Sequence, residues 1–113
     1  MKLRFKFKNG GKIRDSLDII YDFLTAAAKP SLAVQIRRRA RINGATFSEY
    51  LHFLFDAGLI NYDKGRYVAT EKAAEYRRLY NEYTRGLRNQ TQIHQRMLKL
   101  LNIDSGGDVT PGE

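Results

Sequence analysis

The sequence predicts a mainly α-helical fold of the α+β class, with one short β-hairpin and a long C-terminal helix. Three successive segments carry apolar residues at helical spacing and precede two short strand-like segments, and a proline-free segment follows them from Thr70 to about Asn102. The chain has 113 residues, no cysteine and a formal net charge of +8. These values predict one domain with an extension, and they exclude disulfides and thiolate metal sites.

Neither a membrane span nor a secretory signal is expected. No apolar run approaches the roughly 20 residues that a membrane helix needs, and the N-terminal residues lack the apolar stretch of a signal peptide. Together with the formal net charge of +8, which attracts polyanions, this leads us to expect a protein that works in the cytoplasm or nucleoid.

The first 14 residues form a basic segment of their own. From Lys2 to Lys8 the basic residues alternate with Leu3, Phe5 and Phe7, which is the period of a half-buried strand. A disordered basic arm is the alternative interpretation.

The first predicted helix begins at a cap formed by Asp15 or Ser16 and runs to about Ala28, where Lys29-Pro30 follows. Its Asp18 and Asp22 are more simply a solvated helix face than a pair of acid–base carboxylates.

Two shorter helices are expected next. Ser31 is the predicted cap of a helix from Leu32 to about Arg41, with Val34, Ile36 and Ala40 facing inward. Asn43 is the predicted cap of a helix from Gly44 to Ala57, which Gly58 ends. The apolar stripe of that helix consists of Phe47, Tyr50, Leu51 and Leu54.

The hairpin and the last helix complete the pattern. Leu59 to Tyr62 and Arg66 to Ala69 flank a glycine-containing loop, which suits a β-hairpin and closes a domain of residues 15–69. Residues 70–103 form the predicted dimerising helix, because its apolar seam extends beyond any core of this size. The seam comprises Tyr76, Leu79, Tyr83, Leu87, Gln90, Ile93, Met97 and Leu100. A helix that folds back or frays after Gly86 is the alternative, and residues 104–113 read as a disordered tail.

The order helix, helix, helix, hairpin is that of a winged helix, in which the helix from Gly44 to Ala57 would enter the major groove of DNA. Its outer face offers the candidate base-contacting residues Ala45, Thr46, Ser48, Glu49 and His52. None is an arginine that could grip a guanine edge, so limited base selectivity is expected. Glu49 would repel phosphate unless it accepts from a cytosine amino group or pairs with an arginine.

Basic residues flank that helix on both sides. Arg37, Arg38, Arg39 and Arg41 precede it with no acid among them, and Lys64 and Arg66 lie at the predicted hairpin tip. Such cations bind phosphates and release counterions. We expect only two or three of the four arginines to face one phosphate row.

No catalytic or cofactor-binding pattern is present in the sequence. His52 and His94 have no cysteine or second histidine at a metal-ligand spacing, and no phosphate-binding glycine motif occurs. We therefore expect neither an enzyme nor a bound cofactor or metal.

Several blocks of the chain resemble a known family. They are residues 14–20, Ile36 with residues 40–42, residues 50–54 followed by residues 58–60, and residues 67–72. In these blocks the chain resembles the small archaeal winged-helix DNA-binding proteins, described as ten-kilodalton chromatin-associated proteins. The resemblance implies a homodimer held by an antiparallel coiled coil of the C-terminal helices, and binding of double-stranded DNA.

The leading hypothesis is therefore double-stranded DNA binding, by a nucleoid-architectural protein or a transcription regulator. One alternative is a protein-interaction adaptor built on the same fold, with Leu3, Phe5 and Phe7 as an adhesive edge. The other is RNA binding, for which the same basic surface would serve.

Overall fold

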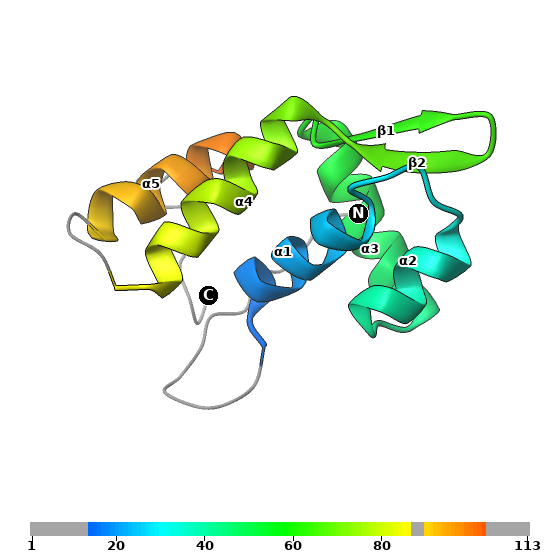
Figure 1. Cartoon of the computed structure of the whole chain (residues 1–113), viewed down its shortest axis with the longest axis horizontal. Coiled ribbons are helices and arrows are strands. Elements are labelled where there is room, and N and C mark those ends of the chain that lie inside the picture. The colour runs from blue at the N-terminus through cyan, green and yellow to red at the C-terminus, as the bar shows by residue number, and fades with distance from the viewer. Residues whose placement is uncertain (1–13, 87–89, 104–113) are drawn as a thin grey trace.

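The computed structural model describes residues 14–86 and 90–103, and it has the predicted order of helices and hairpin (Figure 1). The elements are α1 (Ser16–Ala26), α2 (Ala33–Ala40), α3 (Gly44–Asp56), β1 (Ile60–Asp63), β2 (Arg66–Ala69), α4 (Glu71–Thr84) and α5 (Gln90–Leu100). β1 and β2 form a two-stranded antiparallel sheet. The mainly α fold class with one hairpin is thus confirmed, whereas the predicted N-terminal strand or arm and the C-terminal tail lie outside the described residues, apart from Arg14.

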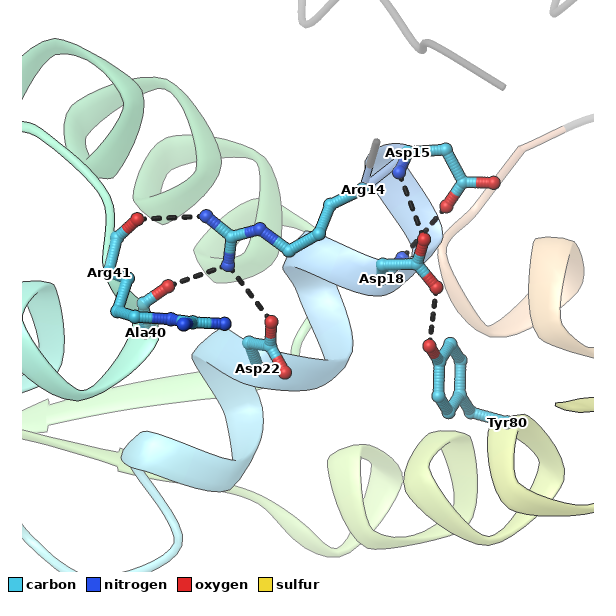
Figure 2. A network of polar contacts seen from close by, with 7 residues as sticks. All are labelled: Arg14, Asp15, Asp18, Asp22, Ala40, Arg41 and Tyr80. Atoms are coloured by element: carbon cyan, nitrogen blue, oxygen red, sulfur yellow. Dashed lines mark hydrogen bonds and ion pairs between the residues drawn. The ribbon is translucent and has the colours of Figure 1, made fainter. Parts of the chain in front are cut away.

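Helix α1 begins at Asp15, one of the two predicted caps, and the capping is reciprocal. Asp15 accepts a hydrogen bond from the Asp18 N–H, and the Asp18 carboxylate accepts one from the Asp15 N–H at 3.0 Å. The expectation that Asp18 and Asp22 form a solvated face is wrong. Asp18 is only 8% exposed and accepts a hydrogen bond from Tyr80, and Asp22 pairs with Arg14 at 2.9 Å (Figure 2). The reason is tertiary: Tyr80 of α4 reaches Asp18, whereas Arg14, which also donates to the end of α2, pairs with Asp22.

Ser31 has a different role from the predicted one. α2 begins after Leu32, whose N–H donates to the Gln35 side chain at 2.9 Å. Ser31 instead exchanges two backbone hydrogen bonds with Tyr67, at 2.9 and 2.8 Å, and so joins the segment before α2 to strand β2. Val34 was expected to face inward and is 50% exposed. α2 buries Ile36 and Ala40, one turn apart, and Val34 lies on the opposite side of the helix from Ile36.

Helix α3 and the hairpin follow the sequence closely. The Asn43 side chain accepts from the Thr46 N–H at 2.8 Å, and Gly58 ends the helix with a φ of +82°. Asp63 lies opposite Arg66, so Lys64 and Gly65 alone form the turn, both with positive φ (51° and 82°). A two-residue loop with both φ angles positive matches the twist of an antiparallel hairpin.

The prediction of one continuous helix over residues 70–103 is wrong, and the alternative of a chain that folds back describes the structure. α4 ends at Thr84, Gly86 adopts a left-handed φ of +68°, and α5 packs against α4 (Figure 1). A left-handed glycine is a common helix terminator. The chain thereby buries its own apolar seam, without a partner.

The eight predicted seam residues fall into three groups in the structure. Tyr76, Leu79, Ile93 and Met97 are at most 6% exposed within the single chain. Tyr83 and Leu100 are half-buried at the margin of the same core. The structure does not describe Leu87 or the side chain of Gln90.

One core joins all the helices. Phe23 of α1 stacks on Phe47 of α3 with ring centroids 5.3 Å apart, and Tyr76 of α4 donates to the Leu17 carbonyl at 2.9 Å. Among the described residues, no helix is both long enough and apolar enough to cross a bilayer.

Candidate nucleic-acid interface

The exposed face of α3 is small and weakly polar. Ala45, Ser48 and His52 are exposed, whereas Thr46 and Glu49 are half-buried. The helix contains no lysine or arginine, and its only charged residues are Glu49 and Asp56. This face can approach a groove closely, but attraction to phosphates has to come from its neighbours.

Arg37 of α2 is one such neighbour. A Cβ atom placed on Gly44 would lie 3.7 Å from the Arg37 guanidinium, so this cation sits against the first residue of α3. Helix N-termini attract anions through unpaired N–H groups and the helix dipole. The structure thus brings a guanidinium and a helix N-terminus to the same place, a juxtaposition suited to a phosphate.

Arg38 and Arg41 are also exposed near the C-terminal end of α2. Arg41 has a left-handed φ of 57° and caps the helix. The Arg14 guanidinium holds the C-terminal end of α2 against α1. It donates to the carbonyl oxygens of Ala40 and Arg41 at 2.7 and 2.8 Å and pairs with Asp22 of α1 (Figure 2). Sequence reasoning counted Arg14 only as part of the basic arm.

Arg39 points elsewhere. Its Nη1 donates to the Ala26 carbonyl at 3.3 Å and to the Ser31 hydroxyl at 3.1 Å. This arginine therefore links the C-terminal end of α1 to the loop that precedes α2. Of the four arginines in the predicted cluster, Arg37, Arg38 and Arg41 have their side chains free of such an intramolecular bond in the described structure.

Three hydrogen bonds fix α3 against the rest of the domain. Tyr50 donates to the Ser16 hydroxyl at 3.0 Å, and burial is the main cause that raises the pKa of Tyr50. At the other end, the Lys72 ammonium donates to the Ala57 carbonyl at 2.6 Å, and the Thr70 hydroxyl donates to the Gly58 carbonyl at 2.8 Å. The outer face of α3 is thus presented by a rigid support.

The hairpin places its cations at one end. Lys64 is exposed in the two-residue turn, and Arg66 is exposed at the start of β2, opposite Asp63. The hairpin extends away from the helices (Figure 1). Both residues that the sequence assigns to the hairpin tip therefore lie exposed at that end of the hairpin.

Sequence reasoning missed an open aromatic hollow between α3 and the hairpin. It is lined by Leu51, His52, Phe55, Tyr62 and Tyr67, and we refer to it as the aromatic hollow. Phe55 and Tyr62 are 51% and 55% exposed. The hairpin register, which pairs Tyr62 with Tyr67, is the signal that could have revealed half of it. The position of Phe55 requires the tertiary structure.

No metal-binding group of histidine and acidic residues occurs within residues 14–86 and 90–103. A protein-family model described as winged helix-turn-helix matches residues 13–88, which is about two thirds of the chain. A comparison with curated protein sequences gives no match.

Proposed function

Since the chain belongs to the winged helix-turn-helix family, we propose that it binds double-stranded DNA with limited sequence preference. α3 lies in the major groove, α2 flanks it on the sugar–phosphate backbone, and the hairpin contacts the adjacent backbone or minor groove. The protein acts as a nucleoid-architectural protein or a transcription regulator, without catalytic activity.

The observation that carries this proposal is the position of Arg37 beside the N-terminus of α3. A phosphate there would meet a guanidinium and helix N–H groups together, and both bind phosphate favourably. Arg38 and Arg41 extend the same charge along the end of α2. Ile42 and Asn43, between Arg41 and α3, add no acid.

Limited sequence preference follows from the face of α3. Specific readout in the major groove depends mostly on bidentate arginine, lysine, asparagine or glutamine contacts. None of these residue types occurs between Gly44 and Asp56. Backbone contacts then supply most of the affinity, and DNA shape supplies most of the discrimination.

The test is a titration of binding against salt. Wild-type protein should lose affinity steeply as salt increases, and replacing Arg37, Arg38 and Arg41 by alanine should reduce the slope by about 2–3, because each phosphate contact contributes roughly 0.9. The matched control replaces Arg85, Arg96 and Lys99, which are exposed outside the proposed interface and remove the same charge. An equal loss in both triple variants would mean that only net charge matters. Salt-independent or absent DNA binding by folded protein would favour the adaptor alternative.

We also propose a homodimer, as the resemblance implies, formed by exchange of α5. Within one chain, α5 packs against α4, and Tyr76, Leu79, Ile93 and Met97 are buried in the same core. An identical set of contacts forms if α5 of one chain leaves its own α4 and packs on the partner's, which is a domain swap. Straightening the chain at Gly86 would give the long helix that the sequence pattern predicts. The state of assembly is measurable by light scattering on a size-exclusion column.

A further inference from the structure

The aromatic hollow exposes more ring surface than the fold requires. Two of the four most exposed large apolar side chains of the described structure, Phe55 and Tyr62, line it. A small domain that leaves two large aromatic residues half in water on one patch commonly uses that patch for binding.

The rings of the hollow are held in place from behind. Tyr67 packs edge-on against the buried ring of Phe47, with centroids 6.1 Å apart, and Tyr62 lies 4.9 Å from Tyr67. Tyr67 is also fixed by its two backbone hydrogen bonds to Ser31. Tyr62 therefore presents its ring on a preorganised support, which lowers the entropy lost when a ligand stacks on it.

The residues around the aromatic hollow indicate which kind of ligand it binds. It is open rather than enclosed, so a flat ligand that stacks on ring faces fits better than one that must be surrounded. His52 connects it to the outer face of α3, and Lys64 and Arg66 lie on the hairpin that carries Tyr62. Aromatic rings beside cations are the arrangement that binds unpaired bases, with the rings stacking on bases and the cations on phosphates.

We propose that the aromatic hollow stacks an unpaired nucleobase, so that the protein prefers duplex DNA next to a single-stranded segment over continuous duplex. This inference rests on the proposed DNA binding and deepens it. The duplex lies along α2 and α3, and the displaced strand passes over Phe55 and Tyr62. The cations of the hairpin face the phosphates of that strand.

The experiment compares a blunt duplex with the same duplex carrying a single-stranded extension, by fluorescence anisotropy at fixed salt. A fluorescent adenine analogue in the extension reports stacking directly. Wild-type protein should bind the extended duplex on the order of ten-fold more tightly and quench the analogue. Phe55→Ala together with Tyr62→Thr should remove the preference and the quenching. These side chains are half-exposed, so the fold is retained, as circular dichroism will verify.

Val34→Ala is the matched control, because Val34 is equally exposed and lies outside the hollow. It should keep both the preference and the quenching. Equal affinity for the two DNAs, or a preference that survives in the double variant, overturns the inference while blunt-duplex binding still supports the proposed function. Preference for single strands without salt-dependent duplex binding overturns the proposed function instead. If the extension adds nothing and an apolar dye binds wild-type protein but not the double variant, the hollow takes an apolar small molecule and the inference is wrong.

Discussion

Replacing Gly86 by alanine should convert the helical hairpin of α4 and α5 into a continuous helix and favour the dimer. Gly86 has a φ of +68°, and a Cβ atom added there meets no atom of the described residues within 4 Å. The substitution therefore creates no clash, and its whole effect is conformational. Alanine opposes the left-handed turn that folds α5 back, and it supports the helical conformation that would replace this turn.

The size of the effect follows from these two terms. A left-handed conformation costs a residue with a Cβ atom about 1–2 kcal/mol, and alanine is better than glycine in a helix by about 1 kcal/mol. The folded-back state thus loses about 2–3 kcal/mol per chain relative to the straight helix. An exchanged dimer contains two such chains, so its association constant should rise roughly a thousand-fold or more.

The assay is size-exclusion chromatography with light scattering over a wide range of protein concentration. Gly58→Ala is the matched control, because Gly58 also has a positive φ, of +82°, with nothing within 4 Å of an added Cβ atom. It carries the same strain but lies outside the helical hairpin, so it should lower stability without changing the oligomeric state. If Gly86→Ala dimerises no more strongly than Gly58→Ala, the exchange mechanism is refuted.

Three further changes test the interior and the hairpin. Tyr80→Phe removes the hydrogen bond to the buried Asp18 carboxylate. It should lower the free energy of unfolding, measured by denaturant titration, by about 1–2 kcal/mol. An unchanged free energy of unfolding would mean that this hydrogen bond does not stabilise the fold. Desolvation lowers the pKa of His94 below its ordinary 6.5, with Asp15 opposing the shift. As the pH drops, the unfolded chain therefore binds a proton at His94 before the folded chain does. The free energy of unfolding should then decrease as the pH falls below 6.5, and His94→Gln should flatten this dependence. Lys64→Asn places in the turn a residue that tolerates the left-handed φ, and it should stabilise the hairpin by a few tenths of a kcal/mol. It should also reduce the salt slope of DNA binding by about 1, because one phosphate contact is lost. An unaltered slope would exclude Lys64 from the interface.

Much of the fold could be predicted from the sequence because it depends on neighbouring residues. Asn43 caps α3 through a hydrogen bond to a residue three positions later, and Gly58 ends it by adopting a conformation that other residues avoid. The hairpin turn is likewise decided within four residues. Such features need no knowledge of what packs on them.

Polar roles were less predictable. Asp18 and Asp22 occupy the same helix face, and sequence spacing alone predicts that both are solvated. Their burial and pairing depend on Tyr80 and Arg14, which are distant in sequence or on a different element. The role of Arg39 was equally hard to predict, because its neighbours Arg37 and Arg38 are the same residue type with the same charge. Only the arrangement of α1 and α2 assigns it to the Ala26 carbonyl.

The sequence by itself determined the order of the first three helices, the caps of α1 and α3, the hairpin and the basic character of the region before α3, since each depends on local conformation or on composition. The tertiary structure decided what covers the seam of residues 70–103, which arginines face outward, and that Phe55 and Tyr62 meet in one hollow. The physical reason is that an apolar stripe specifies a face to be buried but not the surface that buries it. A helix of the same chain and a helix of a second chain satisfy it equally well.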